Sequence, residues 1–252
     1  MSFRLRKLRR IAQQEGSVGA LRFLSHDLYY RFIHLLAFPL QRRRTGAPGR
    51  DLLAEFAKMM VQRGAADVLE IGARAVSDRT SRDLFPPPLR YTGFDLHAGP
   101  NVDVVGDAHE LTAHLPENAF DGVFSISVFE HLLMPWKVVL EINRVLKPGG
   151  IVFVGTHPCW PPHELPWDFW RYQPNAFWAL FNASTGFELL ATITDTPARI
   201  LPAGRSLILS GTVKTVCPMS VTVLARKVGP HDPRLSWPVT AADATPTLYP
   251  TA

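Results

Sequence analysis

Short apolar runs rich in β-branched residues alternate with longer amphipathic stretches through the middle of the chain. Apolar runs of this length predict buried strands, and apolar residues three and four positions apart predict helices. The alternation predicts a parallel sheet with helices on its faces, which is the doubly wound α/β class. The predicted strands are 67–71, 90–94, 102–105, 121–125 and 151–155, with helices at 77–84 and 135–146.

The pattern continues differently after the fifth of these strands. A helix is predicted at 175–182, and strand patterns return at 187–194 and 220–227. We expect the last two strands to pair antiparallel at the edge of the sheet. The predicted fold is therefore a Rossmann-like, seven-stranded, mostly parallel sheet with an antiparallel edge strand.

The flanking regions lack this alternation. Residues 1–40 carry apolar side chains at helical spacing, whereas residues 41–50 are rich in charge, Gly and Pro, as is typical of a linker. A helix is predicted at 51–63 with Asp51 as its N-cap. Five prolines and little periodicity in the last stretch predict a poorly ordered tail. The chain thus divides into a basic helical extension and linker (1–50), an α/β domain (51–228) and a Pro-rich tail (229–252).

Composition excludes several classes of protein. The 252 residues are 46% hydrophobic and 19% charged, which excludes a wholly disordered chain. Two cysteines, Cys159 and Cys217, are too few for a disulfide framework or a four-cysteine zinc site. The basic start lacks the hydrophobic stretch of a signal peptide, and no apolar run is long enough to span a membrane. We therefore expect a cytoplasmic protein.

The net charge of +5 is unevenly distributed. Residues 1–50 hold eleven Arg and Lys residues against two acidic residues, so the rest of the chain is net negative. A basic arm of this kind is typical of contact with an anionic membrane surface or an acidic partner, although a solvated basic helix face fits equally well. Nucleic-acid binding is disfavoured because no nucleic-acid-binding module is recognisable. We expect the arm to dock over the pocket or to mediate dimer contacts.

The first two predicted strands end in residues that suit a nucleoside. Glu70 and Gly72 stand at the end of the first strand, and Asp95 ends the second. In sheets of this class a ligand lies beyond the carboxyl ends of the strands, where an acidic residue accepts hydrogen bonds from the ribose hydroxyls. This layout alone fits either NAD or S-adenosylmethionine.

Three later segments distinguish these two cofactors. They are Gly-Asp-Ala-His-Glu-Leu at 106–111, Phe-Asp-Gly-Val-Phe-Ser-Ile-Ser-Val-Phe-Glu-His at 120–131 and Glu-Ile-Asn-Arg-Val-Leu-Lys-Pro-Gly-Gly at 141–150. With the first motif, and in this order, they resemble class I S-adenosylmethionine-dependent methyltransferases, specifically the methyltransferase type 11 group. The resemblance covers residues 52–228. A nicotinamide-dependent oxidoreductase would instead need a glycine-rich turn that is absent here.

The resemblance implies a set of cofactor-binding residues. The first motif would face the methionine part of S-adenosylmethionine, Asp95 its ribose and Asp107 its adenine. Arg74 or Arg79 would meet its carboxylate. The implied set is Glu70, Gly72, Ala73, Arg74, Asp95, Asp107, Ala108, Ser125 and Ser127.

One departure from the family pattern concerns the first motif, which is usually a run of alternating glycines. Residues 72–78 read Gly-Ala-Arg-Ala-Val-Ser-Asp, so a single glycine remains. A Cβ restricts backbone torsions that glycine leaves open, and the loop must therefore follow another path. The alternative to an enzyme is thus a non-catalytic, methyltransferase-like binding module with a degenerate cofactor loop.

Methyl transfer from a sulfonium needs no protein nucleophile, but a hydroxyl acceptor benefits from a general base. His131 and His157, after the fourth and fifth strands, are the candidate bases. The aromatic segment that follows, residues 160–178, is the predicted acceptor lid. Its candidate substrate-binding residues are Trp160, His163, Trp167, Asp168, Trp170 and Tyr172. The spacing of His157, His163 and Asp168 matches no standard metal motif, so no metal is expected. We predict a transferase of the EC 2.1.1 class that methylates a small-molecule or glycan-type acceptor at a hydroxyl oxygen.

Overall fold

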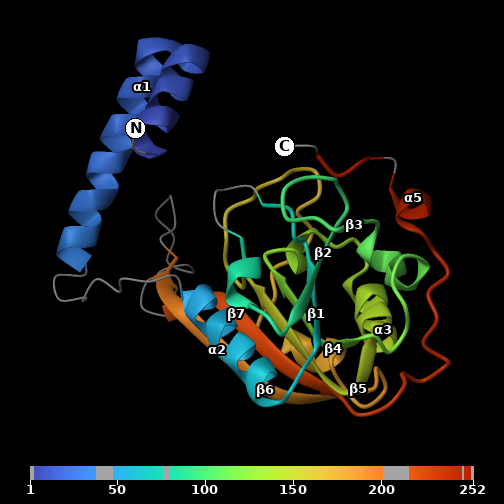
Figure 1. Cartoon of the computed structure of the whole chain (residues 1–252). Helices are drawn as coiled ribbons and strands as arrows, with labels where there is room; N and C mark the ends of the chain where they lie inside the picture. The colour runs from blue at the N-terminus through green and yellow to red at the C-terminus, as the bar shows by residue number, and fades with distance from the viewer. Residues whose placement is uncertain (1–2, 38–47, 76–79, 201–215, 246, 251–252) are drawn as a thin grey trace. The chain divides into compact units, whose positions relative to one another are not determined.

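The computed structural model describes residues 3–37, 48–75, 80–200, 216–245 and 247–250 (Figure 1). The chain divides into two compact units, Met1–Thr45 and Gly46–Ala252, each considered by itself. The boundary falls inside the predicted linker. The tail belongs to the second unit, which we call the body.

The body is built on a seven-stranded sheet in the order β3-β2-β1-β4-β5-β7-β6. Strands β1 to β5 pair in parallel, whereas β7 runs antiparallel to both of its neighbours, β5 and β6. This is the predicted fold class. The strands are β1 (Asp67–Ile71), β2 (Arg90–Asp95), β3 (Val104–Val105), β4 (Phe120–Ile126), β5 (Leu146–Thr156), β6 (Phe187–Arg199) and β7 (Val216–Lys227).

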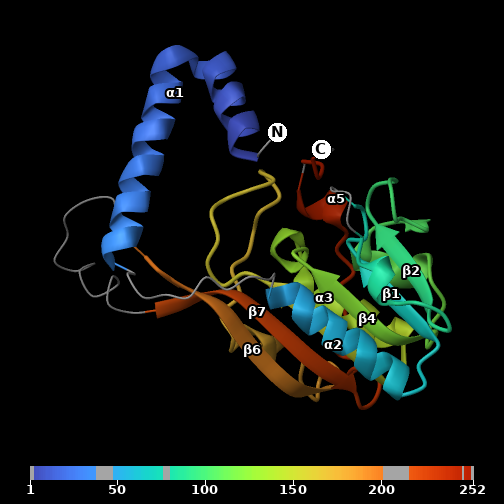
Figure 2. The same ribbon diagram turned by 60° about the vertical axis from the view of Figure 1, so that its left-hand side comes forward.

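Helices cover both faces of the sheet, as Figure 2 shows for α2 (Pro48–Gln62) and α3 (Pro135–Val145). Successive side chains of a strand point to opposite faces, so each strand supplies both cores. Phe124 of β4 packs with Phe56 of α2. Its neighbour Val123 joins the other cluster, with Val138 of α3. Burial on both faces explains why these strands read as nearly continuous apolar runs.

The remaining helices are short, and two predictions about helices were wrong. Of the predicted helix at 77–84, residues 77–79 lie outside the described residues, and of the rest only Arg82–Leu84 is helical, as the short 3-10 helix η1. Helix α2 begins at Pro48, so Asp51 lies inside it and is not its N-cap. The other short helices are η2 (Ala108–Ala113), η3 (Phe129–His131), α4 (Ala176–Leu180) and α5 (Ala241–Ala244).

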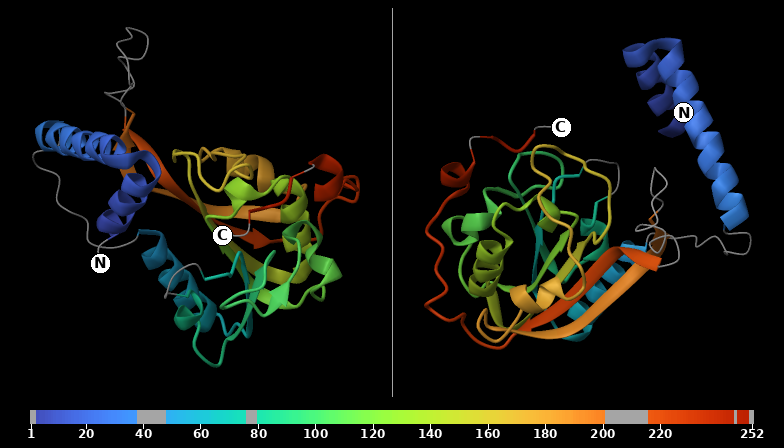
Figure 3. Two further views of the ribbon diagram at one scale, coloured as in Figure 1. Left: turned by 90° about the horizontal axis from the view of Figure 1, so that it is seen from above. Right: turned by 180° about the vertical axis from the view of Figure 1, so that it is seen from behind.

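The described part of the tail packs along the rest of the body, whereas the sequence predicts a poorly ordered segment. Figure 3 shows it running along the side of the body past α3. The indole of Trp237 packs on that of Trp136, with ring centroids 5.5 Å apart, and Lys137 donates a hydrogen bond to the carbonyl of Val239. The tail then returns to the carboxyl edge of the sheet, where Trp167 donates to the hydroxyl of Thr247. Individual aromatic and polar contacts fix it without periodic patterning.

The first unit consists of α1 (Phe3–Ala37), which turns sharply at Gly16 (Figure 2). Gly16 has φ 69°, a left-handed conformation that glycine adopts without strain. Within this unit the side chains of Leu21, Leu24 and Leu28 are exposed. Among the described residues, no helix combines the length and apolar character needed to cross a membrane.

Candidate functional site

A cavity of about 380 Å³ opens at the carboxyl ends of β1, β2 and β4. This is the edge where ligands bind in doubly wound sheets. Most of the residues singled out in the sequence line it. They are Glu70, Gly72, Ala73, Arg74, Asp95, Asp107, Ala108, Ser127, His131 and Trp167.

The remaining glycine of the first motif forms the turn after β1. Gly72 has φ 83°, and a Cβ at this position would lie 2.2 Å from Cγ2 of Val128. Both the torsion angle and the close approach therefore require glycine. The backbone N–H groups of Gly72 and Ala73 both donate to the carbonyl of Phe94, which ties the turn to β2. The single glycine is thus the one that the turn needs.

Asp95 is held by the backbone on both sides of its carboxylate. Oδ2 accepts from the N–H of Arg74 at 3.0 Å, and Oδ1 accepts from the N–H of His97 at 2.9 Å. The Arg74 guanidinium lies 4.0 Å from Oδ1. Each oxygen keeps a further lone pair, so the carboxylate is oriented and still able to accept hydrogen bonds from a ligand.

Glu70 lies deeper, at the end of β1, and is 6% exposed. Burial raises the pKa of its carboxyl group to about 7, although hydrogen bonds from Ser81 and Asn101 partly oppose this. The Tyr91 hydroxyl also donates to Glu70, and the Asn101 amide donates to the carbonyl of Ala73 at 2.9 Å. Asn101 thereby joins Glu70 to the turn, a connection that no pattern in the sequence predicts.

Asp107 caps η2 at the opposite wall of the cavity. Its Oδ1 accepts from the backbone N–H of His109 at 2.9 Å and lies 2.6 Å from Nδ1 of that ring. Burial opposes ionisation, but these hydrogen bonds outweigh it and lower the pKa of Asp107. Nε2 of His109 accepts from the N–H of Met134, so this buried histidine fixes Asp107 to the start of α3.

The two serines of the fourth strand differ. Ser125 is 1% exposed and does not line the cavity, so the prediction that it lines the cofactor site was wrong; it is a β4 residue directed into the interior. Ser127 lines the cavity with φ 54°, an unusual left-handed conformation for a serine. Its Oγ lies 3.1 Å from Nε2 of His157. The turn at the end of β4 therefore aims one serine, not two, at the cavity.

His157 adjoins the cavity through Ser127 and is not itself part of the lining. Nδ1 of His157 lies 3.2 Å from the carbonyl of Met219, which can only accept, so Nε2 is left to accept from the Ser127 hydroxyl. Oε1 of Glu130 lies 3.5 Å from Nε2, and the indole of Trp160 stacks on the imidazole. This arrangement suits a proton acceptor whose charged form is stabilised by Glu130.

His131 lines the cavity directly. Its Nδ1 lies 2.6 Å from the carbonyl of Trp167, so Nδ1 carries the proton and Nε2 keeps its lone pair. Nε2 is 3.9 Å from Oε2 of Glu164, and the ring is 6% exposed. His131 is therefore fixed in orientation by the lid.

Of the six predicted substrate-binding residues, Trp167 alone lines the cavity. Three others stabilise the lid. Trp170 donates to the carbonyl of Leu132, and Tyr172 donates to that of Phe129, where burial raises the pKa of its phenol. A two-bonded ion pair with Arg171 lowers the pKa of Asp168 to about 2.

The other two predicted residues lie beside the cavity. Trp160 is 41% exposed on its stack with His157, and the His163 ring contacts that of His131 at 4.7 Å between centroids. The aromatic richness of the segment therefore reflects the packing of the lid more than its contact with the cavity.

Sequence reasoning missed several residues of the lining. Tyr249 of the tail contacts Trp167 and His131 with ring centroids 5.9 Å away from each, and its hydroxyl donates to Glu164. No pattern in the sequence connects residue 249 to this site. The unpredicted lining residues are Ile71, Ala75, Thr80, Ser81, Phe94, Leu96, Asn101, His109, Ile126, Val128, Leu132, Glu164 and Tyr249.

The region of similarity to known proteins includes the residues at the ends of β1 and β2 that line this cavity. A family model described as a methyltransferase domain matches residues 56–154. Over 94 residues the chain is 32% identical to a ubiquinone biosynthesis O-methyltransferase of Pectobacterium atrosepticum, covering 37% of this chain and 39% of the relative. It is 23% identical over 149 residues to the human thiol S-methyltransferase TMT1B, covering 53% of this chain and 59% of the relative. The chain thus spans about two fifths of the length of the curated O-methyltransferase it matches.

A solved structure supports the same assignment at the level of the fold. A protein of Bacillus halodurans assigned as a methyltransferase superposes with a TM-score of 0.54 at 16% identity, covering 70% of this chain and 99% of the other. The family match ends at residue 154 and so excludes the lid and the tail. The resemblance expected from the sequence is confirmed: residues 56–154 match a methyltransferase domain, and the body shares the fold of a solved class I methyltransferase-like structure.

Proposed function

We propose that this chain is a class I methyltransferase that transfers the methyl group of S-adenosylmethionine to a hydroxyl oxygen of a small-molecule or glycan-type acceptor. The observation that carries the proposal is the pairing of the Gly72 turn with the oriented carboxylate of Asp95 on one cavity. A half-buried carboxylate that lines the cavity beside a backbone turn that excludes a Cβ suits the ribose and methionine parts of this cofactor. S-adenosylmethionine would supply an electrophilic methyl group and leave as a neutral thioether.

The residues present have separate roles in this proposal. Asp95 accepts hydrogen bonds from the ribose hydroxyls, and the Asp107 loop lies beside the adenine. Arg74, whose side chain is 21% exposed, is the cation available for the methionine carboxylate. Glu70 lies close to the turn, where an ammonium group would favour its ionised form.

The acceptor proton needs a path to a base as the new oxygen–carbon bond forms. Ser127 lines the cavity and donates to His157, so we propose that the hydroxyl proton passes through Ser127 to Nε2 of His157. Glu130, 3.5 Å from Nε2, would pair with the resulting imidazolium. His131, the other candidate base, also lines the cavity, and its Nδ1 donates to the carbonyl of Trp167.

Calorimetric titration with S-adenosylmethionine and S-adenosylhomocysteine tests the cofactor assignment, with NAD as the competing ligand. Micromolar binding of both sulfur compounds supports it. Failure of the folded chain to bind either compound would favour a non-catalytic module that has lost its cofactor. Labelled-methyl transfer to phenols, sugars, thiols and amines then tests the acceptor, and reaction of amines or thiols alone would contradict a hydroxyl acceptor.

The role of the basic arm is a separate proposal. Its charge and the exposed leucines of α1 support contact with an anionic surface or a second copy of the chain. Deleting residues 1–40 is expected to alter vesicle binding or native mass while leaving cofactor affinity unchanged. A cytoplasmic location stays a prediction.

A further inference from the structure

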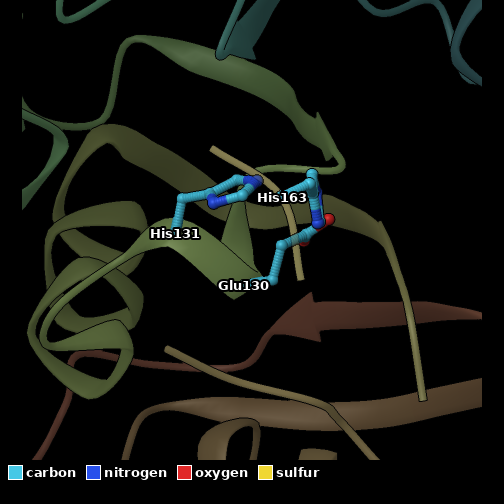
Figure 4. Close-up of side chains that lie close together, drawn as sticks. All are labelled: Glu130, His131 and His163. Atoms are coloured by element: carbon cyan, nitrogen blue, oxygen red, sulfur yellow. The ribbon is translucent and has the colours of Figure 1, made fainter. Parts of the chain in front are cut away.

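Two histidines and a buried carboxylate meet beside the cavity, and one of them, His131, is part of its lining. Glu130, His131 and His163 each offer one ligand atom, and these three atoms lie within 4.8 Å of one another (Figure 4). Glu130 and His131 are neighbours in η3, whereas His163 comes from the lid. The fold therefore assembles a cluster whose sequence spacing matches no standard motif.

A bound cation would stabilise the buried carboxylate of Glu130. The residue is 0% exposed, and Oε2 accepts from the Thr156 hydroxyl at 2.5 Å. Oε1 has no hydrogen-bond partner among the described residues. Buried carboxylates are ordinarily paired or bound to metal, because desolvation of an unpaired charge is costly. One of the two carboxylate oxygens belongs to the cluster, and Oε1 also lies 3.5 Å from Nε2 of His157.

Both histidines are held as metal ligands usually are. Nδ1 of His131 donates to the carbonyl of Trp167, and Nδ1 of His163 lies 3.1 Å from the carbonyl of Pro161 and 3.5 Å from Oδ2 of Asp168. A ligating imidazole typically donates its second N–H to such a carbonyl or carboxylate. This fixes the tautomer and leaves Nε2 of each ring with a lone pair.

We propose that Glu130, His131 and His163 bind one first-row divalent cation, with zinc and cobalt as fitting ions. Imidazole suits such ions, and two histidines with one carboxylate leave coordination positions open. Glu164, whose Oε2 is 3.9 Å from Nε2 of His131, is placed to serve as a further ligand. This inference replaces the expectation from sequence that the chain carries no metal.

The cation would act on the acceptor, and in this respect the inference rests on the proposed function. A hydroxyl bound at an open coordination position has a lowered pKa, so it loses its proton more readily. The ion would thereby select acceptors with an ionisable oxygen over unactivated ones.

The test measures cation binding directly. The full chain, stripped with a chelator, is dialysed against Zn²⁺ or Co²⁺, and bound metal per chain is measured together with the visible absorption of Co²⁺. We expect one equivalent of metal and a Co²⁺ spectrum typical of nitrogen and oxygen ligands. H163Q is expected to weaken binding by about tenfold or more, the usual scale for loss of a contact at a metal site. His163 is partly exposed, so this variant is expected to fold; H114Q, a histidine outside the cluster, is the matched control.

The outcomes separate this inference from the proposed function. Stoichiometric metal that is retained by H114Q and lost in H163Q supports the site, whether or not any acceptor is methylated. A folded wild-type chain that binds neither ion, or an H163Q variant that binds as tightly as the wild type, overturns it. Binding of S-adenosylhomocysteine to the stripped protein reports on the Asp95 side independently, because that side holds none of the proposed ligands.

Discussion

The two sides of the cavity are built by different rules. The cofactor side comes from residues that end β1 and β2 or follow β3, and each lies within a few positions of a strand. The acceptor side is completed by Glu164 and Trp167 of the lid and Tyr249 of the tail. Sheet topology alone brings the first set together, whereas the second depends on packing between distant segments. The residues of the two sides therefore differ in how far they can be substituted without disturbing the fold.

The largest expected effect falls on the acceptor side. H157Q removes the proposed proton acceptor, so kcat should fall by roughly 10²–10⁴-fold, the usual range for a general base. Affinity for S-adenosylhomocysteine should stay unchanged, because His157 lies behind Ser127. Steady-state kinetics and calorimetry on the same preparation measure the two quantities. An H157Q enzyme with wild-type kcat would remove the relay from the mechanism.

On the cofactor side, Glu70 makes stability depend on pH. Its carboxyl group binds a proton in the folded chain up to about pH 7 but loses it near 4.5 when unfolded, so the free energy of unfolding falls as pH rises through this window. The loss amounts to at most about 3.5 kcal/mol, at roughly 1.4 kcal/mol per pKa unit. E70Q should flatten this dependence in urea titrations between pH 5 and 8. An unchanged slope in E70Q would assign the effect to other groups.

D95A should weaken binding of S-adenosylmethionine by about a hundredfold. The substitution removes a charged acceptor of hydrogen bonds and leaves the backbone N–H groups of Arg74 and His97 without the carboxylate that holds them. Calorimetry measures the change. D83A, which removes an exposed aspartate of η1, is the matched control and should bind normally. Equal affinities in D95A and the wild type would place the cofactor elsewhere.

The smallest effect is expected where the tail meets the lid. Y249F removes the hydroxyl that donates to Glu164 but keeps the ring contacts with Trp167 and His131. The KM for the acceptor should rise by a few fold, in line with about 1 kcal/mol for one hydrogen bond. Cofactor affinity should not change. A larger effect on cofactor affinity than on KM would contradict the division of the cavity into two sides.

The strands were predictable because burial on both faces gives each an apolar run with clear ends. β1 has the predicted bounds and β2 ends one residue later than predicted, whereas β5 begins at Leu146, five residues before its predicted start. The conformation of short connecting segments was not predictable, since a single turn such as η1 depends on its flanking prolines and tertiary contacts. The edge position of Gly72 and Asp95 follows from strand order, and so the cofactor side could be inferred.

The lid and the tail were inferred less well, for a physical reason. Aromatic content in 160–178 indicates burial, but it does not say which rings face a ligand, and Trp170 and Tyr172 turned out to donate to backbone carbonyls of the body. Glu164 and Tyr249 meet through a contact between residues far apart in the chain. The proposed metal site was not predictable from the sequence for the same reason, because His163 reaches Glu130 and His131 only after the lid has packed.

The return of the tail to the cavity also has a consequence for the order of synthesis on the ribosome. The strands and turns that bear Gly72, Asp95 and Asp107 precede the segment bearing Thr247 and Tyr249 along the chain, so they leave the ribosomal exit tunnel before it. A nascent chain therefore holds one wall of the cavity before the opposite wall is complete. In the proposed function, a chain cut before Thr247 would retain cofactor without orienting an acceptor.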